Sequence, residues 1–124
     1  MEILKYLENS NIVKEFEIVN FRVFKDGFYM KIMVKLINNT ELHIREYSDI
    51  ESRDYSYHWQ NTDKKLIRRW DNTPHHKEIK TYPHHLHVGD EILESYSISC
   101  VEIMNTIENI INQEYMEFPV GKVK

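Results

Sequence analysis

The sequence predicts an α+β fold: an antiparallel β-meander of about five to six strands, with a short N-terminal helix and a longer C-terminal helix packed on one face. Three observations lead to this prediction. Several segments before about residue 90 alternate apolar and polar residues, as half-buried strands do. Asn, Asp and Gly residues that favour turns separate these segments. Apolar residues recur at helical spacing at the start and near the end of the chain.

The first half of the chain is predicted to form the short helix and three strands. Residues 1–9 carry leucines and an isoleucine on one helical face. Runs rich in Val, Ile and Phe then indicate strands, with turns at Gly27 and at the pair Asn38-Asn39. These strands are predicted to span residues 13–24, 28–37 and 41–47.

The second half is predicted to contribute two further strands, a loop and the long helix. Within residues 53–60, Tyr55, Tyr57 and Trp59 alternate with polar residues such as His58, so the aromatic rings and His58 are expected on opposite faces. A partner strand is predicted at 66–72, a proline-marked loop at 73–83 and a short extended piece at 85–88.

The helix has its own start signal. Ser99 and Glu102 have the spacing of a capping box, in which each side chain accepts a hydrogen bond from the other's backbone N–H. Apolar residues follow at helical spacing, and Pro119 lies beyond them, so the helix is predicted to end near Tyr115.

Composition indicates one globular domain, residues 1–124. A hydrophobic content of 41% argues against a disordered chain. The single cysteine, Cys100, permits no internal disulfide and favours a reducing, cytoplasmic location. No apolar run approaches the roughly 18 residues that would span a membrane, and no signal peptide follows Met1.

The stretch from Tyr55 to Asp90 concentrates the residues that carry chemistry. It contains six of the seven histidines and both tryptophans. Residues 53–87 hold 7 basic and 4 acidic groups, whereas residues 90–118 hold 7 acidic groups and no basic one. A positive region in an acidic protein suits an anionic ligand such as RNA phosphate, although the charges can equally pair across the fold.

Three blocks in this stretch resemble a known family. They are Tyr57-His58-Trp59-Gln60, then Arg69-Trp70-Asp71-Asn72-Thr73-Pro74-His75-His76, then Pro83-His84-His85-Leu86-His87. With their spacing, they resemble the TumE-type toxins of prokaryotic toxin–antitoxin modules. The resemblance implies a toxin whose partner is a cognate antitoxin, a small DNA-binding protein encoded next to it. It does not imply a particular reaction.

Acid–base cleavage of RNA without a metal is the favoured chemistry. Histidine suits both proton-transfer roles because it titrates near neutral pH, and arginine suits the charge that develops on phosphorus. The expected catalytic pair is His76 and His85, with Arg69 as the cation and His58 or Tyr57 as an orienting group. The residues expected to contact substrate are Arg68, Asn72, His75, His84, Trp59 and Tyr82, the two aromatic rings as platforms for unpaired bases.

Other interpretations stay open. His85 and His87 are two residues apart and share a face of an extended strand, so with His76, and with Asp71 as a carboxylate, they would suit a divalent transition metal. No cofactor is favoured. A non-catalytic module that binds and blocks its target, alone or as a homodimer, is a further alternative. Any single histidine can also be structural.

Overall fold

The computed structural model describes residues 2–122, and the side chains of residues up to 114. Its contacts divide the chain into two compact units. One unit, residues 13–97, is a single β-sheet, and the other is formed by the residues up to Ile12 together with those from Ile98 onward. Each unit is described by itself, and the expectation of one domain stays a prediction.

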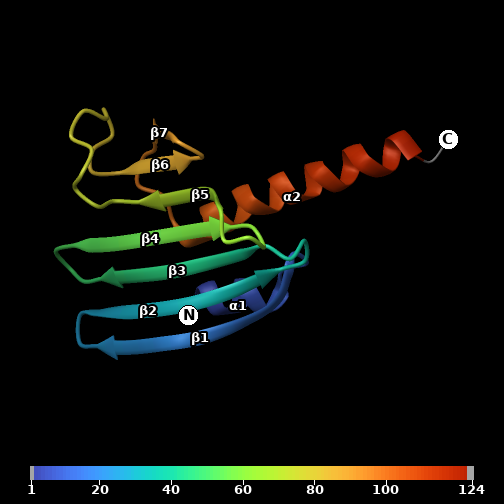
Figure 1. The fold of residues 1–124 in the computed structure, drawn as a ribbon. Helices are drawn as coiled ribbons and strands as arrows, with labels where there is room; N and C mark the ends of the chain where they lie inside the picture. The colour runs from blue at the N-terminus through green and yellow to red at the C-terminus, as the bar shows by residue number, and fades with distance from the viewer. Residues whose placement is uncertain (1, 123–124) are drawn as a thin grey trace. The chain divides into compact units, whose positions relative to one another are not determined.

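The sheet is an antiparallel meander in which every strand pairs with its neighbours in the sequence (Figure 1). Its strands are β1 (Val13–Phe24), β2 (Gly27–Leu36), β3 (Glu41–Ser48), β4 (Arg53–Gln60), β5 (Leu66–Asp71), β6 (His85–Val88) and β7 (Glu91–Glu94). The predicted α+β class and the meander are confirmed. The predicted strand count is too low by β7, which pairs with β6 through a turn where Gly89 has a φ of 58°.

Alternation along the strands gives the sheet one buried apolar face and one polar face. The buried face carries Met30, Ile32, Val34, Leu36, Leu42, Ile44, Tyr55, Tyr57, Trp59 and Trp70. The opposite face carries basic, acidic and imidazole side chains from β2 to β6. Because the period of a strand is 2, the register of the sheet decides which of these polar side chains become neighbours.

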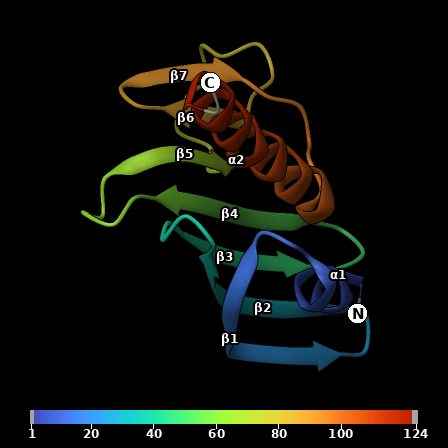
Figure 2. The ribbon, with the colours of Figure 1, turned by 90° about the vertical axis from the view of Figure 1, so that its right-hand side faces the viewer.

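The first strand is irregular. The pairing of β1 with β2 shifts register after Val13 and again after Ile18, so that β1 carries extra residues at two places. Such β-bulges bend a strand, and Figure 2 shows the bend in β1. The long strand therefore curves along the edge of the sheet.

The second unit contains two helices, α1 (Glu2–Asn9) and α2 (Cys100–Lys122). The Tyr6 hydroxyl donates to Asn105 Oδ1 over 2.7 Å and joins the two helices. The predicted capping box is confirmed, since Ser99 and Glu102 exchange two hydrogen bonds of 3.1 Å. The predicted end of the helix near Tyr115 is wrong, since α2 continues past Pro119 to Lys122. A proline inside a helix removes one backbone N–H donor, and the helical backbone continues here without it.

Within the residues that the structure describes, neither helix is both long and apolar enough to cross a membrane.

Candidate functional site

Two neighbouring rows of side chains run across the polar face of the sheet. In the first row, register pairs His43 with His58, His58 with Arg69, and Arg69 with His87. In the second row, Ser56 pairs with Asp71 and Asp71 with His85. The polar face therefore brings together residues that are up to 44 positions apart in the sequence.

Asp71, on β5, lies at the centre of this arrangement. Its side chain is 3% exposed. Oδ1 accepts the Thr73 N–H over 3.0 Å and lies 3.0 Å from His85 Nε2, whereas Oδ2 accepts Arg69 Nε over 3.0 Å and lies 3.6 Å from His87 Nε2. Burial raises the pKa of Asp71, but the bonds from Thr73 and Arg69 and the nearby His85 outweigh it and lower the pKa. Asp71 is thus a buried, ionised carboxylate shared by three side chains.

His85, on β6, is held on both ring nitrogens. Nδ1 lies 2.9 Å from the Pro83 carbonyl oxygen, and Nδ1 is the donor because a carbonyl oxygen only accepts. Nε2 faces Asp71. The side chain is 2% exposed. The catalytic role expected for His85 would need a ring nitrogen that is open to substrate, whereas here both nitrogens have partners in the protein.

His76 and His87 are the accessible rings beside His85. The three rings pack edge to face, with centroids 4.8 Å apart for His76–His85 and His85–His87 and 5.6 Å apart for His76–His87. The side chains of His76 and His87 are 25% and 23% exposed. His76 comes from the loop after β5, and its Nδ1 lies 3.5 Å from the exposed Glu78. We call His76, His85 and His87 the histidine cluster.

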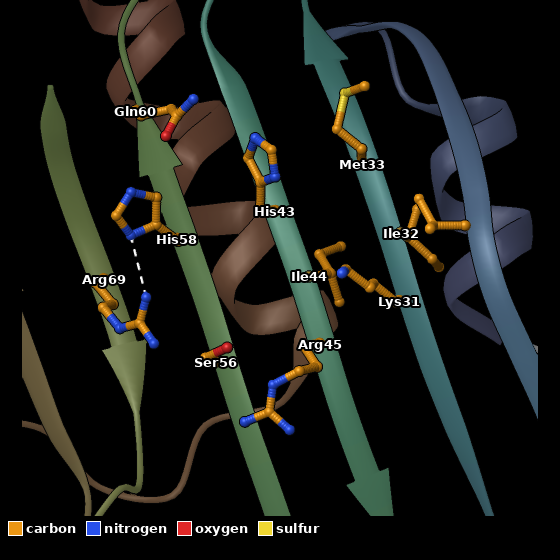
Figure 3. A pocket seen from close by; sticks show the side chains of 11 residues that line it. Lys31, Ile32, Met33, His43, Ile44, Arg45, Ser56, His58, Gln60 and Arg69 are labelled. Carbon is orange, nitrogen blue, oxygen red and sulfur yellow. Dashed lines mark hydrogen bonds between the residues drawn. The ribbon is translucent and has the colours of Figure 1, made fainter. Parts of the chain in front are cut away.

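Arg69 links the histidine cluster to His58 on β4. Its Nη1 donates to His58 Nδ1 over 3.2 Å, while its Nε donates to Asp71 (Figure 3). Burial lowers the pKa of His58, and Arg69 and His43 lower it further. Burial also lowers the pKa of His87, aided by His85, His76 and Arg69 and opposed by Asp71. His58 and His87 are therefore neutral at physiological pH and able to accept a proton.

Three expected site residues lie on the other face of the sheet. Tyr57 and Trp59 are 0% and 1% exposed. The Tyr57 hydroxyl donates to Glu46, and the Trp59 indole donates to the Thr40 hydroxyl. Arg68 pairs with Trp59 and so also points away from Arg69. Strand alternation thus separates all three from the histidine cluster, and Trp59 is too buried to stack on a base.

The remaining expected contacts lie around the loop between β5 and β6. The Asn72 side chain accepts from the Tyr55 N–H and donates to the Arg53 carbonyl, and so ties the start of the loop to β4. His84 Nδ1 lies 2.8 Å from the Tyr55 hydroxyl. Burial raises the pKa of Tyr55 to about 12, so the phenol keeps its proton and donates to His84. His75 and Tyr82 are exposed and lie outside the histidine cluster.

Several polar residues on the same face were missed by the sequence analysis. Lys31, His43 and Arg45, on β2 and β3, line a pocket of ≈ 330 Å³ together with His58 and Arg69. Their alternation along two strands was visible in the sequence. The register of β2 with β3 and of β3 with β4, which brings these residues near His58, was not.

The histidine cluster is also the group that would hold a metal. Among the described residues, one ligand atom from each of the three rings lies within 4.8 Å of the others. Tetrahedral zinc, with Zn–N of about 2.0–2.1 Å, needs ligand atoms about 3.4 Å apart. The donor types fit a transition metal, but the rings would have to close by about 1 Å, and His85 Nε2 would have to leave Asp71.

Acidification should destabilise the fold. The pKa values of His58, His84 and His87 are all lowered, with burial as the largest cause. Below the ordinary histidine pKa of about 6.5, the unfolded chain binds more protons than the native one, so the free energy of unfolding falls as pH decreases. Urea titrations at pH 7.5, 6.5 and 5.5 should show this loss, and His58→Gln should make it smaller. A stability that is constant or higher at pH 5.5 would contradict the assignment.

Comparison with known proteins gives one match. No curated protein and no solved structure matches the chain, whereas the family model described as Toxin TumE matches residues 3–114, nearly the whole chain. The match extends the resemblance seen in residues 55–90 to the helices and the other strands. This chain therefore belongs to the TumE toxin family, and it is the toxin of a toxin–antitoxin module with a cognate antitoxin.

Proposed function

We propose that this toxin cleaves RNA in the cytoplasm by histidine acid–base catalysis without a metal, and that its antitoxin is a small DNA-binding protein. The observation that carries the reaction is that Arg69 and His87 both lie against the buried carboxylate of Asp71, while the ring of His76 packs against that of His87. Two accessible imidazoles and a guanidinium are the groups that a phosphodiester transesterification needs.

In the proposed reaction each group has one role. His87, kept neutral by its lowered pKa, takes the proton of the ribose 2′-OH. The 2′ oxygen then bonds to phosphorus, the bond from phosphorus to the 5′ oxygen breaks, and His76 donates a proton to that oxygen. Arg69 stabilises the negative charge on the phosphorane. The products are a 2′,3′-cyclic phosphate and a 5′-hydroxyl.

His85 and Asp71 position these groups. The His85 ring lies against both His76 and His87, and it is fixed by Pro83 on one side and Asp71 on the other. A catalytic ring that is held by a packed neighbour loses less freedom when the substrate binds.

The test is the pH dependence of RNA cleavage by the purified toxin in excess chelator. One imidazole must be neutral and the other charged, so the rate should rise and then fall between about pH 5 and 8. A 2′-deoxy nucleotide at the cleaved position should block the reaction, because the attacking hydroxyl is gone. A flat pH profile, or cleavage of the 2′-deoxy substrate, would refute the assignment of His76 and His87.

The spacing within the histidine cluster favours one second candidate, a metal-dependent enzyme. The three rings are the ligands expected for it, with the Pro83 carbonyl holding Nδ1 of His85 as backbone carbonyls orient metal-bound histidines. About one transition metal per chain in untagged protein, together with loss of activity in chelator, would establish this candidate in place of the first. Full activity in chelator would exclude it.

A further inference from the structure

The polar face carries a pocket beside the histidine cluster, and Arg69 is the one described lining residue to which the proposed reaction gives a role. It has a volume of ≈ 330 Å³ and is lined by residues of β1 to β5. None of the three cluster histidines lines it. Figure 3 shows it from close by, with His58 and Arg69 at the side nearest the histidine cluster.

The charge of the pocket is positive although the protein is acidic overall. Lys31, Arg45 and Arg69 line it, together with His43 and His58, and no carboxylate is among its described lining residues. Carboxylates touch its lining residues from outside. The buried Asp71 accepts from Arg69 Nε over 3.0 Å and offsets the charge of Arg69. Asp54 lies 3.4 Å from Arg45 and Glu41 lies 3.3 Å from His43, and both of these pairs are partly exposed and so screened by water. Lys31 and Arg45, on neighbouring strands, therefore give the hollow the positive charge that would attract an anion.

The pocket also offers contacts that a bare anion would not use. Val19 and Met33 give it an apolar wall. The Gln60 amide and the Ser56 hydroxyl supply donors and acceptors on the opposite side. A ligand with a negative charge and a flat, partly apolar ring with polar edges matches this lining, and a nucleotide has all of these features.

Arg69 joins the pocket to the histidine cluster. Its Nη1 contacts His58, which lines the pocket, and its Nε contacts Asp71, which holds His85. The strand of Arg45, β3, and the strand of His87, β6, are three strands apart, or about 14 Å across the sheet at roughly 4.7–4.9 Å per strand. Arg45 lies two residues along the strand from the row of His87. A single strand of RNA that runs across the sheet can reach both.

We infer that this pocket binds the base and phosphate of a nucleotide next to the cleaved bond in single-stranded RNA, with Lys31 and Arg45 as its phosphate contacts. The inference rests on the proposed function, and it adds the substrate class and residues outside the histidine cluster. Single-stranded RNA is the expected substrate because a base must leave its stack to enter a pocket.

The test measures binding separately from cleavage. A fluorescent RNA of about ten nucleotides, with 2′-O-methyl groups throughout, binds without being cut and is within the usual single-strand site size. Lys31→Ala and Arg45→Ala should each weaken binding about tenfold and reduce the slope of log K against log salt by about 0.7, the value for one phosphate contact on a single strand. A duplex of the same sequence should bind more weakly than the single strand.

Lys35→Ala is the matched control. Lys35 lies on the same strand and the same face as Lys31, but outside the pocket. The Lys35→Ala variant loses the same charge as Lys31→Ala but no pocket contact. Its affinity for the RNA and its salt slope should therefore stay near those of the unaltered toxin. Equal weakening by Lys31→Ala, Arg45→Ala and Lys35→Ala would show general attraction and overturn the inference, as would no weakening or equal binding of the duplex. If binding follows the expected pattern but the ribose form is not cleaved, the pocket stands and the proposed reaction falls.

Discussion

His87→Ala should slow RNA cleavage by about 10²–10⁴-fold, and His76→Ala should do the same, because in the proposed reaction each removes one positioned proton acceptor or donor. Both side chains are partly exposed, so the losses should be in kcat and not in stability. In cells that lack the antitoxin, either substitution should relieve growth arrest. The measurements are single-turnover cleavage rates of the purified proteins and growth after induction.

His75→Ala is the control for this prediction. His75 directly precedes His76 but is exposed and outside the histidine cluster, so its loss should leave the cleavage rate within about threefold of the unaltered toxin. If His76→Ala and His87→Ala remained as toxic as the original protein while folded, the protein would act by binding and blocking a target. If His75→Ala had the same effect as His76→Ala, the loop as a whole and not one ring would be responsible.

Asp71→Ala should lower the free energy of unfolding by about 3–5 kcal/mol. It removes the buried carboxylate that contacts the His85 ring and Arg69, and losing one partner of a buried, charged hydrogen-bond network has about this cost. It also frees Arg69 and the Thr73 N–H. Asp71→Asn keeps an oxygen for the Thr73 N–H and should lose less. Urea unfolding at pH 7.5 gives both values.

Asp54→Ala is the matched control for Asp71. Asp54 lies on the adjacent strand, on the same face, and pairs with Arg45, but the two side chains are 59% and 39% exposed. Exposed pairs contribute about 0–1 kcal/mol, so this variant should be nearly as stable as the original. Equal losses for the two aspartates would mean that Asp71 is not the buried centre of the site.

Secondary structure could be predicted from the sequence wherever a segment alternated apolar and polar residues or repeated apolar residues at helical spacing. The strand 53–60 was predicted with its correct bounds and faces, because Tyr55, Tyr57 and Trp59 alternate with polar residues. The segment 91–94 has adjacent Ile92 and Leu93 and no alternation, so nothing local marks it as a strand. It becomes β7 because it pairs with β6, and the residue pattern within 91–94 alone does not predict that pairing.

The candidate site was predicted in part. His85 and His87 do share a face, as their spacing of two requires, and His76 joins them. The grouping of Tyr57 with His58 conflicted with the same alternation rule, because adjacent strand residues point to opposite faces. The burial of His85 and the central place of Asp71 depend on the pairing of β5 with β6 and on the loop that brings in His76, and no spacing in the sequence encodes them.

The meander has a kinetic consequence. Every strand pairs with its sequence neighbour, so the sheet forms by closing successive hairpins and has few distant contacts to find. Chains with such local contacts lose less loop-closure entropy before the transition state. They fold faster than sheets whose strands pair with partners distant in the sequence. The residues with a role in the proposed reaction all lie between Arg69 and His87, on β5, on β6 and in the loop that joins these paired strands. The groups of the proposed reaction can therefore come together by the closing of one hairpin.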